Sequence, residues 1–160
     1  MADLRHDGMY LVTWVETIAD TSAPTVTELG AGVQLECRLT PSGLTREQSA
    51  DMIDNSKLCS TFTTQIAGRR SYNLQVIAVR EDDDAAGVEA ALTLDAEGFL
   101  VVRDDMDADT AYVTADTVEV YPAQVASANK STPAANELQT ITYQLASTAE
   151  PVLDAVVATA

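Results

Sequence analysis

Several stretches of the chain alternate between apolar and polar residues, which is the pattern of a β-strand with one buried face. The alternation is regular over residues 33–39 and again over residues 138–145. Residues 58–66 and 72–78 alternate in the same way, and the segment 67–70 between them contains a glycine that suits a hairpin turn. The pattern therefore predicts four strands, two of them joined as a hairpin.

Three further strands are indicated by composition. Residues 99–102 are a continuous apolar run, which is typical of a strand covered on both faces. Residues 118–125 predict another strand, in which Pro122 indicates an edge position or a β-bulge because proline lacks a backbone donor. A last short strand is expected over residues 152–157, after Pro151.

One helix is predicted near residues 83–95. The acidic run 82–84 would provide its N-cap and place negative charge at the positive end of the helix dipole. Val88, Ala91 and Leu92 then fall on one helical face at i, i+3 and i+4.

The remaining segments are expected to be irregular. Residues 1–32 are interpreted as an extended N-terminal arm, because residues 19–32 are rich in Thr, Ser, Ala and Gly, although residues 11–15 could pair as a short strand. Residues 44–57 are polar and predict a long surface loop, and residues 104–117 predict an acidic loop. The expected fold is mainly β: an antiparallel sandwich or half-barrel of about seven strands with one flanking helix, formed by residues 33–160 as a single domain.

Charge narrows the possible functions. The chain has 160 residues with 9 basic and 25 acidic side chains, so its formal charge is −16. Such a balance argues against binding nucleic acid through its phosphates and against docking on an anionic membrane. Residues 81–120 contain 13 of the acids and one base, directly after the only quarter of the chain with a basic excess. This distribution fits either a solvated acidic face or head-to-tail pairing between copies of the chain.

Catalytic chemistry finds little support in the residue types present. The only histidine is His6, near the N-terminus, and no glycine pattern that binds phosphates occurs. We therefore expect no enzyme and no cofactor.

A weak metal candidate is the set Asp105, Asp107, Asp109 and Asp116, whose spacing resembles a calcium-binding loop. Thr110 stands where such a loop requires glycine, so a solvated acidic loop is the preferred interpretation. The two cysteines lack metal-ligand spacing. Cys37 is interpreted as a small core residue, with a disulfide to Cys59 as the alternative.

Five segments in order along the chain resemble the major tail tube proteins of phages with long non-contractile tails, most closely those of phages that infect actinobacteria. They are residues 17–32 (TIADTSAPTVTELGAG), 99–103 (FLVVR), 118–124 (VEVYPAQ), 135–139 (ANELQ) and 151–155 (PVLDA). The resemblance extends over nearly the whole chain, and its signal is the ordered series rather than any one motif.

The resemblance implies a β-sandwich subunit that assembles six to a ring, with rings stacked into a tube in the phage virion after assembly in the host cytoplasm. The implied partners are other copies of the chain, the tape measure protein inside the tube, and the tail terminator and distal tail proteins. DNA would pass through the tube without specific binding, and the chain would not insert into a membrane.

Under this interpretation the residues 1–32 would contact a neighbouring ring, and Arg69 and Arg70 at a hairpin tip would meet acidic residues of an adjacent subunit. The residues expected at subunit or ring interfaces are Val12, Trp14, Ile18, Pro24, Val26, Leu29, Arg69, Arg70, Asp104, Asp105, Asp107 and Asp109. Three alternatives stay open: a terminator or head–tail connector that forms a single ring, the tube of a contractile injection machine, and a stand-alone β-sandwich binding module.

Overall fold

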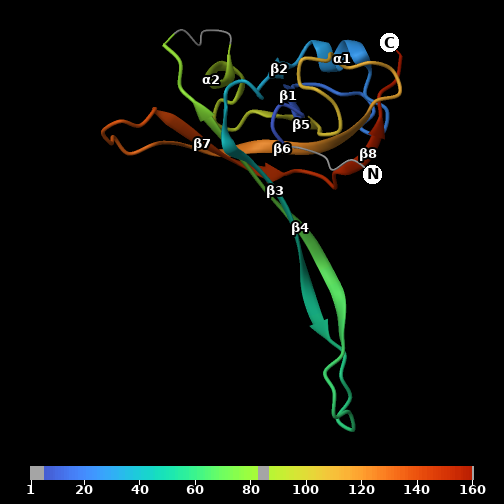
Figure 1. Cartoon of the computed structure of the whole chain (residues 1–160). Helices are drawn as coiled ribbons and strands as arrows, with labels where there is room; N and C mark the ends of the chain where they lie inside the picture. Colours follow the sequence, from blue (N-terminus) through green and yellow to red (C-terminus); the bar gives the residue numbers. More distant parts are fainter. Residues whose placement is uncertain (1–5, 83–86, 160) are drawn as a thin grey trace.

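The structure is a computed structural model that describes residues 6–82 and 87–159. Within these residues, one antiparallel sheet of eight strands is accompanied by two short helices (Figure 1). The strands are β1 (Leu11–Val15), β2 (Val33–Gln34), β3 (Leu39–Asp54), β4 (Gln65–Val79), β5 (Glu97–Arg103), β6 (Thr117–Lys130), β7 (Thr140–Ser147) and β8 (Val152–Val156). The helices are α1 (Val26–Gly30) and α2 (Val88–Ala91). The predicted mainly β, antiparallel fold is confirmed.

The sheet has the order β2-β1-β5-β6-β7-β4-β3, with β8 paired to the first part of β6. The segment 35–38 connects the two ends of this order. The Leu35 N–H donates to the carbonyl of Val12 in β1, and the Val79 N–H of β4 donates to the Arg38 carbonyl, at 2.7 and 2.8 Å. Because this one segment bonds to β1 near one end of the order and to β4 near the other, the sheet curls into a half-barrel.

Strand alternation divides the core into two clusters on opposite faces of β1, β5 and β6. The inner cluster fills the half-barrel and contains Val12, Trp14, Leu35, Leu74, Val76, Leu100, Val102, Tyr121, Ala123, Val125, Ile141, Tyr143 and Leu145. The outer cluster contains Leu11, Val15, Ile18, Leu29, Val101, Tyr112, Val118, Val120, Ala155 and Val157. Strand β1 is thus apolar on both faces because it separates two cores.

The predicted extended arm at residues 1–32 is wrong for its described part, whereas the short strand that residues 11–15 could form is confirmed as β1. Strand β1 lies between β2 and β5, and all five of its residues are buried. The segment that follows turns into α1, whose Thr25 side chain accepts from the Glu28 N–H while the Glu28 carboxylate accepts from the Thr25 N–H. The Thr-x-x-Glu capping box before Leu29 was visible in the sequence, but the Thr and Ser content was interpreted as extended backbone.

The second correction concerns residues 33–70. Only residues 33–34 form a strand before the chain turns, and residues 44–54 of the loop predicted over residues 44–57 belong to β3. The chain reverses at residues 55–64, and the expected turn at residues 67–70 lies within β4. These strands project into solvent, so no buried face imposes an alternating pattern on them.

The helix is shorter than expected. Helix α2 covers residues 88–91 with Gly87 at its N-cap, and the predicted capping residues Asp83 and Asp84 lie outside the described residues. The strands predicted around residues 99–102, 118–125, 138–145 and 152–157 are confirmed as β5, β6, β7 and β8.

Pro122 lies in a central strand rather than at an edge. It pairs with Phe99 of β5 on one side, and on the other it falls where pairing with β8 ends and pairing with β7 begins. Its carbonyl accepts from the Thr148 N–H in the linker between those strands. Proline has no N–H group to donate, and Pro122 lies where β6 has no strand partner on that side in the described structure, so no hydrogen bond is lost.

Candidate functional site: a projecting hairpin and its anchor

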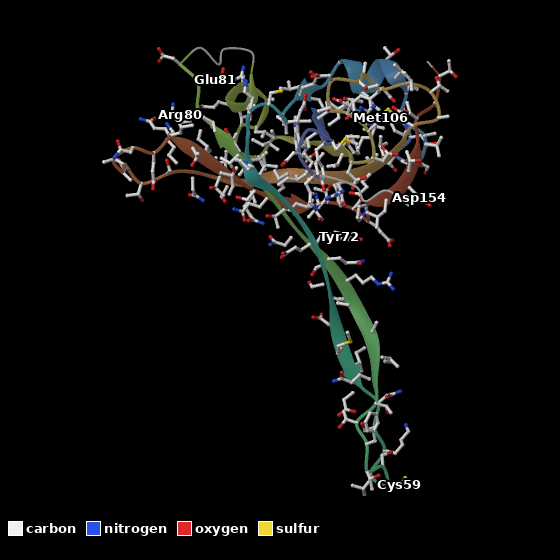
Figure 2. All side chains as sticks on the ribbon, viewed as in Figure 1. Cys59, Tyr72, Arg80, Glu81, Met106 and Asp154 are labelled. Carbon is white, nitrogen blue, oxygen red and sulfur yellow. The ribbon has the colours of Figure 1, made fainter. Side chains whose placement is uncertain are left out.

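Strands β3 and β4 continue beyond the half-barrel as a long two-stranded hairpin (Figure 1). Pairing between β4 and β7 ends at Leu74, so from residue 73 outward β4 has β3 as its only strand neighbour in the described structure. We call residues 47–71 the arm. Figure 2 shows side chains projecting along it from Tyr72 at its root to Cys59 near its tip. The arm makes no contribution to either core cluster.

The arm exposes large apolar side chains. Leu58 at the tip is fully exposed, and Phe62 is 78% exposed. Met52, Ile53 and Ile66 follow along the strands with 51–61% exposure. The arm thus holds five of the ten exposed large apolar residues in the described part of the chain. Exposed large apolar side chains gathered on one projecting segment indicate an interaction surface.

The tip is a defined structure held by polar side chains. The Asn55 N–H donates to the Thr64 carbonyl, the Thr64 N–H donates to Ser56 Oγ, and the Ser56 N–H donates to the Asp54 carboxylate. The bond from Ser56 lowers the pKa of Asp54. These bonds hold residues 57–63 at the end of the hairpin, where Leu58 and Phe62 are displayed.

The charges of the arm balance each other. Its acids are Glu47, Asp51 and Asp54, and its bases are Lys57, Arg69 and Arg70. The arm is therefore neutral, and the rest of the chain carries the whole charge of −16. Elsewhere, Arg38, Arg46, Arg80 and Arg103 each pair with a carboxylate, whereas the described residues show no ion pair for the three bases of the arm.

Arg46 anchors the root of the arm to the half-barrel. From β3 its guanidinium reaches Glu119 of β6 and Asp104 after β5, with 2.7 Å from Nη2 to the Asp104 carboxylate. The Tyr121 hydroxyl donates to the same Glu119 at 2.8 Å. Partial burial opposes the charge on Arg46, but the hydrogen bond that Arg46 donates to Asp104 and the charge of Glu119 outweigh it and raise the Arg46 pKa. Burial and the Glu119 carboxylate raise the pKa of Tyr121.

A second arginine organises the predicted acidic loop. Arg103 is fully buried and its Nη1 lies 2.9 Å from the Asp116 carboxylate. The same guanidinium donates to the carbonyls of Asp107, Thr110 and Ala111. Its carbon atom lies 5.3 Å from the centre of the Tyr112 ring. The loop at residues 104–116 is therefore wrapped around a buried cation.

Tyr112 closes this loop over the outer core. Its hydroxyl is 3.0 Å from Thr13 Oγ1 of β1, and burial raises its pKa to about 12. The weak calcium interpretation fails on the same geometry, because Asp116 is engaged by Arg103 and the Asp107 carboxylate accepts from the Asp109 N–H. No three metal-ligating side chains of the described residues gather at one point.

The structure separates the predicted interface residues into two groups. Val12, Trp14, Ile18, Pro24 and Leu29 are buried within the subunit, which contradicts their assignment to an interface. Val26 is only half-buried against the outer core, so its assignment stays a prediction. Their apolar character reflects β1 and α1 in the core. Arg69, Arg70, Asp104, Asp105, Asp107 and Asp109 are exposed. Arg69 and Arg70 lie midway along β4 rather than at the hairpin tip.

The cysteines are both exposed and free, so the expectation of a buried Cys37 is wrong and the alternative disulfide is absent. The chain leaves β2 after residue 34, which turns Cys37 out of the alternating register. Sequence reasoning also missed the exposure of Leu58 and Phe62, which it placed on a half-buried strand. The signal was the turn-forming cluster Asp54-Asn55-Ser56-Lys57 just before them. In the part of the chain that the structure describes, no helix has the length and apolar character needed to cross a membrane.

Comparison with solved structures shows a shared fold. A chain in the "Virion of native gene transfer agent (GTA) particle" aligns with a TM-score of 0.55 and 14% identity, covering 96% of this chain and 99% of that one. A chain in the 6-fold symmetrised baseplate of the anti-feeding prophage (AFP) aligns with a TM-score of 0.55 and 11% identity, covering 95% and 96%. A search of curated proteins gives no match.

A comparison with models of protein families gives a match over the whole chain. A model described as "Phage tail tube protein" matches residues 1–160. The expected closeness to phages of actinobacteria stays a prediction. Because the match spans the whole sequence, this chain is a structural component of the virion tail and belongs to the phage tail tube protein family.

Proposed function

We propose that the chain polymerises head to tail into stacked rings of six, that the arm of each copy contacts neighbouring copies, and that it has no catalytic activity. The resulting tube belongs to a long non-contractile tail, is assembled in the host cytoplasm, surrounds the tape measure protein and conducts the genome. Tail terminator and distal tail proteins bind its two ends.

The exposed apolar surface of the arm carries this proposal. Leu58 and Phe62 stand at the end of a hairpin that touches neither core of its own subunit. Fully burying a side chain of this size contributes about 1.5–3 kcal/mol. A two-stranded hairpin is also only marginally stable by itself in water. Both facts favour an arm that is buried against another copy in the assembled state.

Charge supports a passage for DNA rather than a binding site for it. All of the net charge of −16 lies outside the arm, on the body that would form the tube wall. An acidic wall repels phosphates and allows DNA to move along it without specific contacts. The arm is neutral, so contacts between the arms of different copies are not weakened by repulsion between like net charges.

The predicted contact of Arg69 and Arg70 with acids of an adjacent subunit stays a prediction. Asp105, Asp107 and Asp109 are exposed and available for it, while Asp104 already bonds Arg46. These acids lie on the body, so the contact would join the arm of one copy to the body of another.

Shortening the arm tests the proposal. Ala50 pairs with Arg70, so residues 51–69 can be replaced by Asn-Gly, a sequence that favours a two-residue hairpin turn. We expect the wild-type protein to form tubes in negative-stain electron microscopy. The shortened variant should keep a cooperative thermal transition in circular dichroism and form no tubes.

Tubes formed by the shortened variant at the wild-type protein concentration would overturn the role of the arm. Wild-type protein that forms only isolated rings would instead support a terminator or connector. A wild-type monomer that never polymerises, even with isolated tail tips, would support the binding module.

A further inference from the structure

The two strands of the arm carry opposite charges. Glu47, Asp51 and Asp54 lie on β3, and Arg69 and Arg70 lie on β4. No acid occurs between Gln65 and Arg80 on β4, and the only base on β3 is Arg46 at its root. The arm therefore has one acidic strand and one basic strand over the same length.

Both strands also have a free edge along the arm. In the described structure β3 pairs only with β4, and β4 pairs with β7 only from Leu74 onward. Each edge exposes backbone N–H and C=O groups that another strand can bond. Beside the root of the arm, residues 67–72 and the linker 147–151 border a groove of about 710 Å³, so the edge of β4 is open there.

The charges also lie at matching heights along the arm. Ala50 pairs with Arg70 and Met52 with Ala67, which places Asp51 beside Arg69 in the intervening register shift. Asp54 lies further toward the tip and Glu47 further toward the root, opposite Gln65 and Asn73. An arm placed beside another without axial displacement therefore brings the basic pair of one to the level of Asp51 of the next.

We propose that the arms of neighbouring copies pair laterally, with the β3 edge of one arm bonded to the β4 edge of the next. This inference rests on the proposed function, because it requires copies arranged around a common axis with their arms pointing the same way. Strands β3 and β4 run in opposite directions, so such neighbours meet as an antiparallel pair. The contact uses different surfaces on the two copies, and it closes into a ring when the rotation closes.

Lateral pairing accounts at once for the free strand edges, the opposite charges and the exposed apolar side chains of the arm. It gives each arm strand a second neighbour, as sheets in water require for stability. It places Arg69 and Arg70 of one arm at the level of Asp51 of the next, with Glu47 further toward the root, and cross-strand pairs of opposite charge are favourable. It also brings the exposed side chains of Met52, Ile53 and Ile66 beside those of the next arm.

Charge exchange between copies tests the proposal. R69E/R70E makes both strands acidic, and E47K/D51K makes both strands basic. We expect each variant alone to pellet as tube about tenfold less than wild type, because like charges then meet at every arm contact. A 1:1 mixture should recover wild-type assembly, since acidic and basic arms can alternate around a ring with an even number of copies.

The body acids provide the matched control. The variant D105K/D107K carries the same charge change on the loop after β5 instead of the arm. Recovery of R69E/R70E by D105K/D107K, and not by E47K/D51K, would overturn lateral pairing in favour of an arm-to-body contact. Normal assembly of both arm variants alone would overturn it as well.

Crosslinking gives a second readout that does not depend on charge. Ser49 and Ser71 face each other across one arm with 2.8 Å between their hydroxyl oxygens, so they mark the same height on the two strands. We expect a mixture of S49C and S71C copies, in a C37S/C59S background, to give crosslinked dimers with a short bismaleimide after assembly. Copies carrying S49C alone should give none.

The outcomes separate this inference from the proposed function. Tubes without S49C–S71C dimers would overturn lateral arm pairing and leave the tube intact. Failure of the wild-type protein to form tubes under any condition would overturn the proposed function itself.

Discussion

Arg103 and Asp116 form a buried ion pair with 2.9 Å between Nη1 and Oδ2, and this pair holds the acidic loop against the sheet. The side chains are 0% and 5% exposed. Arg103 ends β5, and Asp116 directly precedes β6, so the pair also fixes the two ends of the connection between central strands.

Removing the Asp116 carboxylate should lower the stability of the fold. Asp116→Ala leaves the Arg103 charge buried without its carboxylate, and we expect the free energy of unfolding to fall by about 3–5 kcal/mol. Asp105→Ala, an exposed acid of the same loop, should change it by less than about 0.5 kcal/mol. Chemical denaturation of both variants measures the difference, and equal stabilities would contradict a structural role for the pair.

The N-terminal segment should be essential for folding. Deleting residues 1–24 removes β1, whose Trp14 lies in the inner core and whose Leu11 lies in the outer core. We expect that deletion to lose the cooperative thermal transition in circular dichroism, whereas the variant with a shortened arm keeps it. A folded deletion variant would restore the interpretation of residues 1–32 as a detachable arm.

Close packing at Gly98 should forbid a larger residue. A Cβ atom there would lie 2.8 Å from the Trp14 ring and 2.8 Å from the Val15 carbonyl oxygen. Because the second contact is backbone, Gly98→Ala should lower the free energy of unfolding by about 1–3 kcal/mol. Gly30→Ala is the matched control, since nothing lies within 4 Å of its Cβ position. An unchanged melting temperature for Gly98→Ala would show that β1 and β5 can separate without cost.

The capping box predicts a pH-dependent contribution to stability. The backbone N–H groups of Thr25 and Ala19 donate to the Glu28 carboxylate and lower its pKa from the ordinary value of 4.5. A pKa that is lower in the folded state stabilises the fold above the unfolded value, and this stabilisation is lost as the pH falls through the folded value. Wild type should therefore exceed Glu28→Gln in stability at pH 7, and the difference should shrink below about pH 4.5. A difference that stays constant down to pH 2 would show that the charge of Glu28 is not involved.

The tip of the arm should matter for assembly and not for folding. L58S/F62S removes the two most exposed large apolar side chains of the arm, so we expect unchanged thermal unfolding and strongly reduced tube formation. The control T61A/T63A changes two exposed residues that flank Phe62. Sedimentation of assembled protein distinguishes them, and equal pelleting of the two variants would show that the tip is not buried on assembly.

The sequence pattern located the strands that have one buried and one exposed face. Ile141, Tyr143 and Leu145 alternate with Thr142 and Gln144 because β7 faces the inner core on one side only, and its prediction is confirmed. Alternation is absent where both faces of a strand have the same environment, although β5 was still recognised from its continuous apolar run. Strand β1 is buried on both faces, and the distal parts of β3 and β4 are exposed on both, so periodicity carries no signal there.

For the same reason, only part of the candidate interaction surface could be predicted from the sequence. Arg69 and Arg70 were placed at a hairpin tip, whereas they lie exposed within β4, because the chain reverses at residues 55–64. Phe62 and Leu58 were assigned to a buried face because apolar residues usually are buried. The sequence cannot show that they project from the body, because projection depends on which strands lack a third neighbour.

The central claim is that this chain polymerises through its arm, and negative-stain electron microscopy of concentrated wild-type and arm-shortened protein tests it most directly. The account predicts long tubes with a central channel for the wild-type protein and folded, unpolymerised subunits for the variant in which Asn-Gly replaces residues 51–69. Tubes of the same length and abundance from both proteins would contradict it.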